Sequence, residues 1–209
     1  MKRTLTLILI AVAAGAHAQS ITTIFTGGNS NSAGGGNYFQ VTVAGTALTV
    51  TGFDVNTTAA AGTVFGFEVY TTPNTHVGNE LNSAVWALQA TGSGTSAGLN
   101  LPTAISMSNS FNLNAGTSYG MAIFLRGGQG PASLSYTNGN GANQFFSNAD
   151  VSLTLGTATN AFFGPSVFNP RVWNGTMHYT PVPEPASMAA LGLGLAAIVA
   201  RRRRSKKSS

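Results

Sequence analysis

Strict alternation of apolar and polar residues over short segments is the strongest pattern in this chain. In the segment NYFQVTVAG, Phe39, Val41 and Val43 occupy one face of an extended strand, while Gln40 and Thr42 occupy the other. Clusters of Gly, Asn and Ser interrupt such segments about every eight to twelve residues, and these residue types favour turns. The pattern therefore predicts short β-strands joined by tight turns.

No stretch of the body shows a helical period, so we expect an all-β domain of antiparallel strands. A two-sheet β-sandwich of jelly-roll type closes such strands most economically, with a barrel or a β-solenoid as alternatives. The absence of a fixed-period repeat disfavours the solenoid. Gly52 marks a change of apolar face and predicts a bulge or a bend there. The predicted strands lie within 21–25, 38–43, 46–58, 63–72, 84–91, 105–113, 118–126, 133–136, 144–147, 150–156 and 171–180.

The first eighteen residues have the anatomy of a secretory signal peptide. Lys2 and Arg3 precede an apolar run over 5–14, which is too short to span a bilayer unaided. Ala16 and Ala18 then form an A-x-A cleavage signature. We predict a signal helix in 1–18 that is removed after Ala18, with an uncleaved N-terminal anchor as the alternative.

The positive net charge of +5 comes from the two ends of the chain. Between residues 19 and 183 only Arg126 and Arg171 are basic, so the body is slightly acidic and nucleic-acid binding loses its support. The chain has no cysteine, so its stability must come from its core. We predict one ectodomain over 19–180. Its carboxylates are Asp54, Glu68, Glu80 and Asp150.

The C-terminal residues 181–209 combine three parts in a fixed order. A short motif, Val182-Pro183-Glu184-Pro185, precedes an uncharged apolar run over 186–200 and then a basic tail over 201–209. As a helix the apolar run measures roughly 22 Å, which is short of a hydrocarbon core of about 30 Å. We predict a single transmembrane helix there. The positive-inside rule places Arg201, Arg202, Arg203 and Arg204 in the cytoplasm as a stop.

This tail resembles the PEP-CTERM protein-sorting signal of Gram-negative bacteria, also labelled an ice-binding-protein C-terminal domain. The resemblance implies that an exosortase, an integral-membrane cysteine protease-transpeptidase, reads the Pro-Glu-Pro motif and removes the tail. It further implies an inner-membrane precursor, maturation by signal peptidase and exosortase, and delivery to the cell surface or the extracellular matrix. The body resembles, more loosely, secreted bacterial β-sandwich ectodomains, for example in the stretch FNLNAGTSYGMAIF. Neither resemblance implies an active site or ice binding.

Few residues in the body suit catalysis. His76 and His178 are expected at the surface, and no nucleophile elbow or metal-ligand spacing is present. Asp54 and Glu68 lie on consecutive predicted strands, which leaves a glycosidase pair as a distant alternative. We therefore expect no enzyme activity and no catalytic residue.

No cofactor or metal is expected in the body. Calcium is kept as an alternative, and Glu80 and Asp150 are its better candidates because Asn79 and Asn148 flank them.

The aromatic residues suggest where a glycan would bind. Trp86 and Trp173 are in phase with apolar neighbours and are expected in the core. Tyr38 and Phe146, next to loops rich in Gly and Asn, are the expected exposed glycan contacts, together with Phe145. We expect an exported structural or adhesive protein associated with exopolysaccharide. The alternatives are a carbohydrate-binding module for a defined glycan and, more distantly, a secreted hydrolase.

Overall fold

The computed structural model describes residues 17–128, 132–182, 192–194 and 198. His17–Pro181 form one compact unit, and the regular structure is almost entirely β, with 57% strand and 4% helix. A 3₁₀ turn, η1, spans Ser83–Val85. The strands are β1 (Gln19–Thr22), β2 (Asn29–Ser30), β3 (Gly36–Val43), β4 (Leu48–Val55), β5 (Val64–Pro73), β6 (Ala87–Thr95), β7 (Thr103–Met107), β8 (Phe111–Leu113), β9 (Ser118–Gly128), β10 (Ser135–Asn138), β11 (Phe145–Ser147), β12 (Val151–Ala161), β13 (Gly164–Phe168), β14 (Arg171–Trp173) and β15 (Gly175–Pro181).

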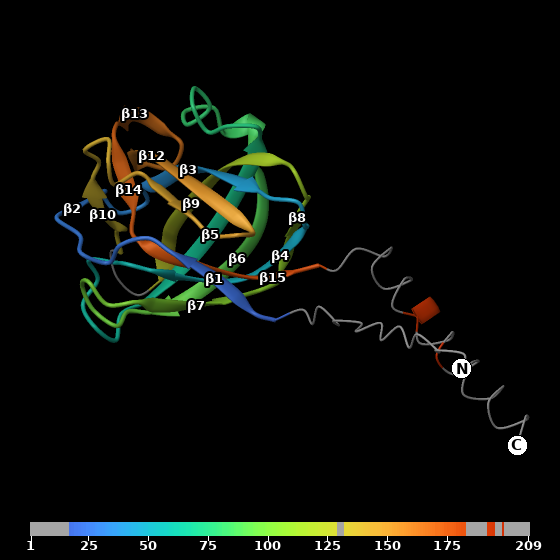
Figure 1. The fold of residues 1–209 in the computed structure, drawn as a ribbon. Coiled ribbons are helices and arrows are strands. Elements are labelled where there is room, and N and C mark those ends of the chain that lie inside the picture. Colours follow the sequence, from blue (N-terminus) through green and yellow to red (C-terminus); the bar gives the residue numbers. More distant parts are fainter. Residues whose placement is uncertain (1–16, 129–131, 183–191, 195–197, 199–209) are drawn as a thin grey trace, which may run out of the picture. The chain divides into compact units, whose positions relative to one another are not determined.

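Twelve of these strands form one antiparallel sheet that curves around the core (Figure 1). Its order is β1-β15-β4-β7-β6-β5-β9-β3-β12-β11, with β13 paired to β12 and β8 paired to β4. A smaller sheet has the order β14-β10-β2. The prediction of an all-β, antiparallel body is therefore confirmed.

The prediction of two facing sheets of a sandwich differs from the structure, because most strands belong to the continuous 12-stranded sheet. This sheet is continuous because β7 changes partner along its length. Its C-terminal residues pair with β6, where Ile105 lies opposite Gly94. Its N-terminal residues pair instead with β4, where Ala104 lies opposite Asp54. The alternation of apolar and polar residues along a strand shows which of its faces is buried, but it does not show which other strand pairs with it.

The two edge strands of the large sheet are tied together by side chains. Asn148, at the turn between β11 and β12, donates from Nδ2 to the carbonyl of Ser20 on β1 at 3.3 Å. The same Nδ2 donates to the hydroxyl of Tyr179 on β15 at 2.8 Å. These bonds leave the curved sheet nearly closed and barrel-like.

The core fills the space inside this curved sheet. Phe39, Val41 and Val43 are all buried there, as their alternation predicts. The ring of Trp173 stacks on Phe39 with centroids 4.9 Å apart, so its expected core position is also confirmed. A second buried cluster consists of Tyr38, Trp86, Ala122, Phe124 and Phe163, with Tyr70 partly buried against it.

The bulge predicted near Gly52 is present. His178 of β15 lies opposite Gly52 of β4, and the next residue, Tyr179, lies opposite Val50, so Thr51 is unpaired. The extra residue reverses the buried face of β4, which explains why Val50 and Phe53 both point into the core.

The terminal predictions fall largely outside the described residues. The signal helix, Ala16, the residues Pro183, Glu184 and Pro185, and Arg201–Arg204 all lie there, while Ala18 and Val182 are described and exposed. Residues 192–194 and 198 are helical. Within the described part of the chain, no helix is long and apolar enough to cross a membrane. The transmembrane helix over 186–200 and the boundaries at 18 and 180 remain predictions.

Replacing Phe39 by Ala should lower the free energy of unfolding by about 3–5 kcal/mol, because the change leaves a cavity beneath Trp173. Urea unfolding of the mature protein measures this loss. Val77→Ala is the matched control, since Val77 is exposed and its truncation should change the free energy little. Equal effects of the two substitutions would contradict the assignment of the core.

Candidate functional site

Four neighbouring strands, β11, β12, β3 and β9, present an uncharged polar face to the outside. Side chains directly opposite one another on paired strands lie on the same face of a sheet. One row across the strands therefore contains Phe145, Thr154, Gln40 and Gly120. The next row contains Ser147, Ser152, Thr42 and Ser118. Gly120 is buried beneath the turn at Thr75 and His76. We call the other seven residues the polar face.

The polar face is held flat by hydrogen bonds between its own side chains. The hydroxyls of Thr42 and Ser118 lie 2.9 Å apart, across β3 and β9. Gln40 donates from Nε2 to the Thr42 hydroxyl at 3.3 Å. Hydroxyl and amide groups of this kind both donate and accept hydrogen bonds, so the face offers directional contacts without charge.

One aromatic ring stands on this face. Phe145 is 62% exposed, whereas its neighbour Phe146 pairs with Leu153 and packs partly buried against the core. Alternation on a strand sends adjacent side chains to opposite faces, so only one of the two rings can be exposed on the sheet. Among the aromatic residues expected to contact a glycan, Phe145 therefore has the accessible ring.

The expectation that Tyr38 is exposed is wrong, because its side chain is only 1% exposed. Tyr38 points outward from β3, but the rings of Trp86 and Phe163 cover it with centroids at 5.6 Å and 6.2 Å. Its hydroxyl lies 3.2 Å from that of Thr159, and burial raises the pKa of Tyr38 above its usual range. This burial removes Tyr38 from the candidate glycan contacts.

His76 is also buried, at 3% exposed, although its position in a turn predicted a surface residue. Its ring lies against the backbone of Gly156 on β12, where any side chain would collide with Nε2. Neither ring nitrogen has a hydrogen-bond partner among the described residues. Burial lowers the pKa of His76, and the nearby Glu80 carboxylate opposes that shift. His76 is therefore packed as a neutral ring.

The two carboxylates proposed for calcium lie far apart. Glu80 is 5% exposed and accepts a hydrogen bond from the Thr157 hydroxyl at 3.3 Å. Thr157 is separated from Asp150 by roughly 20 Å along the extended strand β12. Within the described part of the chain, no three His, Asp or Glu side chains gather as metal ligands. Calcium binding and the expected absence of a cofactor remain predictions.

Asp150 helps to close the sheet. Its carboxylate accepts a hydrogen bond from the Tyr179 hydroxyl at 3.1 Å, and burial is the main cause that raises the pKa of Tyr179 to about 12. Asn148 accepts from the backbone N–H of Asp150 at 3.0 Å and so fixes the turn. Asn148 and Asp150 thus hold the end of β15, a structural role that the sequence pattern did not reveal.

The remaining two carboxylates are paired separately. Asp54 on β4 contacts His178 of β15 at 2.9 Å, on the outer face where His178 was expected. Glu68 on β5 lies 3.7 Å from Arg126 of β9. Strands β4 and β5 follow each other in sequence, but β7 and β6 lie between them in the sheet. This separation does not support a paired-carboxylate site made of Asp54 and Glu68.

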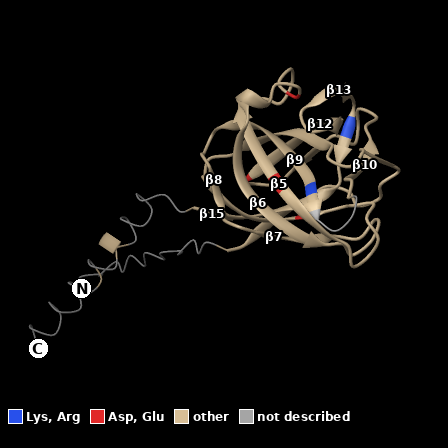
Figure 2. Cartoon of the chain, turned by 180° about the vertical axis from the view of Figure 1, so that it is seen from behind, with Lys and Arg blue, Asp and Glu red and all other residues tan. Residues whose placement is uncertain are grey.

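Glu68 and Arg126 belong to an aromatic network on the outside of β5 and β9. The Tyr70 hydroxyl donates to Glu68 at 2.8 Å, and burial, followed by this bond, raises the pKa of Tyr70 to about 12. The Arg126 guanidinium lies 3.9 Å from the centroid of the Phe162 ring. The charged groups of Glu68 and Arg126 therefore both make contacts within the protein. Figure 2 marks the positions of the charged residues along the backbone and shows how sparse they are in the body.

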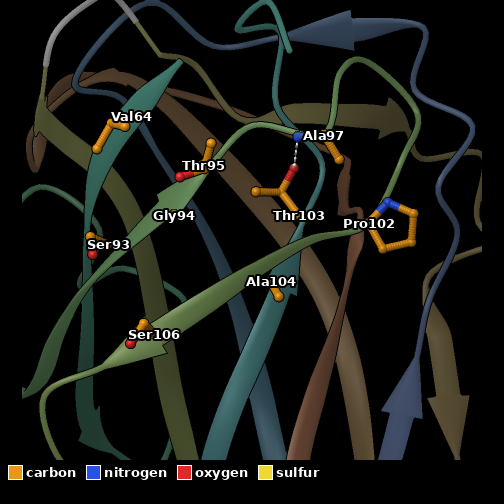
Figure 3. Close-up of a pocket in the computed structure, with 9 residues that line it drawn as sticks. All are labelled: Val64, Ser93, Gly94, Thr95, Ala97, Pro102, Thr103, Ala104 and Ser106. Atoms are coloured by element: carbon orange, nitrogen blue, oxygen red, sulfur yellow. Dashed lines mark hydrogen bonds between the residues drawn. The ribbon is translucent and has the colours of Figure 1, made fainter. Parts of the chain in front are cut away.

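A shallow cavity of about 320 Å³ opens where β6 and β7 diverge (Figure 3). The hydroxyls of Ser93, Thr95 and Ser106 line it together with Val64, and its lining contains no charged residue. Thr103 accepts a hydrogen bond from the backbone N–H of Ala97 at 3.0 Å at its rim. This lining suits a neutral ligand with hydroxyl groups. Like the polar face, it offers hydroxyl groups and no charge.

The body and the tail together define an exported β-rich protein that carries a C-terminal processing signal. Residues 181–204 match the family model of the PEP-CTERM protein-sorting motif. The match confirms the sorting signal predicted from Val182-Pro183-Glu184-Pro185, and this motif implies processing by an exosortase. A comparison with curated proteins finds no matching relative.

The neutral, buried state of His76 predicts a pH-dependent stability. The unfolded chain takes up a proton near the ordinary pKa of 6.5, whereas the folded protein resists protonation. The free energy of unfolding should therefore be highest above this pH and should fall below it, by at most about 1.4 kcal/mol per pH unit for one proton.

Urea unfolding between about pH 7.5 and pH 5.5 tests this dependence, and His76→Gln should reduce the loss of stability at the acid end. His178→Gln is the control and should leave the dependence in place. If His76→Gln and the wild type lost the same free energy over this range, the assignment to His76 would be wrong.

Proposed function

We propose that this protein is a surface or extracellular-matrix protein with a structural or adhesive role in association with exopolysaccharide. The observation that carries this proposal is the PEP-CTERM sorting motif over 181–204, which directs an exported protein to exosortase and to the cell surface. The precursor is held in the inner membrane by its apolar run and basic stop, and signal peptidase and exosortase then release the body. Nucleic acid is not a partner in this scheme.

The chemistry of the body supports association with a polysaccharide. A glycan chain offers many hydroxyl groups and apolar ring faces, so it suits a surface of hydroxyls and amides beside an exposed aromatic ring. The polar face has this composition: Gln40 and Thr42 supply hydrogen-bonding groups, and Phe145 supplies the ring. We propose that this face makes many weak contacts along the polymer and that the body is not an enzyme.

A carbohydrate-binding module for one defined glycan is the second candidate. The cavity between β6 and β7 favours it, because a single site of about 320 Å³ has room for a small part of a glycan chain. Saturable binding of a short, defined oligosaccharide would support the module. Binding that grows with polymer length and lacks a preferred oligosaccharide would support the adhesive role.

Replacing Pro183, Glu184 and Pro185 together by Ala should abolish removal of the tail, because the change deletes the motif that exosortase reads. Mass spectrometry of the protein expressed in an exosortase-containing host measures the remaining precursor. Replacing Ser205 and Ser208 by Ala, outside the matched residues, is the control and should leave processing intact. Normal maturation of the triple variant would refute the sorting proposal.

Replacing Phe145 by Ala should weaken binding of the mature protein to purified exopolysaccharide by about tenfold, the expected loss for one stacking ring. Co-sedimentation with the polymer measures the affinity. Leu88→Ala is the matched control, since Leu88 is an exposed apolar residue on β6, outside the polar face. Equal binding by Phe145→Ala and the wild type would exclude the polar face as the contact.

A further inference from the structure

The last strand of the body, β15, is hydrogen-bonded on both of its edges. It lies between β1 and β4, with Gln19 opposite Tyr179 on one side and Leu48 opposite Pro181 on the other. A strand paired on both edges has no free backbone groups with which to enter the extended binding cleft of a protease. Cleavage near such a strand therefore requires part of it to leave the sheet.

The end of β15 is held to different degrees along its length. Thr180 and Pro181 are paired with β4 alone and are half-buried. Tyr179 is fully buried in the core, and its hydroxyl is bonded to both Asn148 and Asp150. The terminal two residues can thus separate without uncovering the core, whereas further opening must extract the Tyr179 ring.

The sorting motif begins directly after this strand. Pro181 is the last paired residue, Val182 is 40% exposed, and Pro183-Glu184-Pro185 follow. A protease that binds its substrate as an extended strand needs chain on the N-terminal side of the motif that is free of other pairing. Only Thr180, Pro181 and Val182 are available for this without opening the core.

The N-terminal processing point is close to the same place. Gln19, the first residue after the predicted cleavage at Ala18, lies opposite Tyr179. The pairing of β1 therefore places the start of the mature body beside the end of β15. The first and last paired residues of the body, Gln19 and Pro181, thus both lie close to Tyr179.

Resting on the sorting function proposed above, we propose that the closed end of β15 is a gate that limits the rate of tail removal. The rate of processing follows the fraction of molecules in which the end of β15 has left β4. The bonds of Tyr179 to Asn148 and Asp150 set how far this opening extends. The mature protein keeps its complete sheet after processing, because β15 ends at Pro181 and Pro183-Glu184-Pro185 come after it.

A spacer separates the gate from the motif and tests this proposal directly. Six Gly and Ser residues inserted between Pro181 and Val182 leave β15 and the Val182-Pro183-Glu184-Pro185 sequence intact, and they separate only Pro181 from the rest of the matched residues. In pulse-chase labelling of the full chain in an exosortase-containing host, we expect tail removal about fivefold faster than in the wild type. The same spacer placed after Gly141, in the turn before β11, is the control and should leave the rate unchanged.

A second variant tests the role of Tyr179 without changing the chain length. Tyr179→Phe keeps the buried ring and removes the two hydrogen bonds of its hydroxyl. Tail removal should become at least about threefold to fivefold faster, because opening that reaches Tyr179 then no longer breaks two hydrogen bonds, one of them to the Asp150 carboxylate. Tyr136→Phe, a change at another buried tyrosine, is the matched control and should process at the wild-type rate.

The outcomes separate the gate from the sorting function itself. A wild-type rate in the Pro181 spacer variant would overturn the gate, and so would equal acceleration by both spacers. Retention of the tail by the wild type, at the level of the motif-to-alanine variant, would contradict the sorting function and with it the gate.

Discussion

The enclosure of the apolar core by one curved sheet is the constraint on which the rest of this structure depends. The chain has no cysteine, so no disulfide contributes, and inward-facing residues such as Phe39 and Trp173 must supply the stabilisation. Their burial requires the sheet to curve and nearly close. The partner change of β7 and the bonds of Asn148 to Ser20 and Tyr179 achieve this closure.

The near-closure of the large sheet determines which chemical groups lie on the outer surface. With the apolar side chains turned inward, strands β11, β12, β3 and β9 expose hydroxyls and amides in two rows. Several of the few charged side chains are bound within the protein: Asp54 contacts His178, and Glu68 contacts Arg126. The result is a neutral, hydrogen-bonding exterior, which suits contact with a hydrated polymer better than recognition of a charged ligand.

Local alternation predicted a large part of this fold, because the burial of a strand residue depends mainly on the face it occupies. Phe39, Val41 and Val43 point inward as predicted, and the phase change at Gly52 marks a real bulge. The same reasoning failed for Tyr38 and His76. Both are covered by residues distant in sequence, with Trp86 over Tyr38 and Gly156 beneath His76, and no local pattern reports such contacts. The partner change of β7 was missed for the same reason.

The C-terminal signal was predictable because a short motif of defined residue types can be recognised directly in the sequence. Its three parts are visible in order from Val182 onward, and the family model matches residues 181–204. The body adds what the motif lacks, since β15 brings the folded sheet to within two residues of Pro183. The sorting motif therefore follows the last strand of the folded body with almost no linker between them.

The intact mass of the protein recovered from the surface of exosortase-containing cells tests the central claim most directly. The account predicts the mass of a chain that begins at Gln19 and from which the basic tail containing Arg201–Arg204 has been removed. Recovery of a surface protein whose mass still includes those arginines would contradict it.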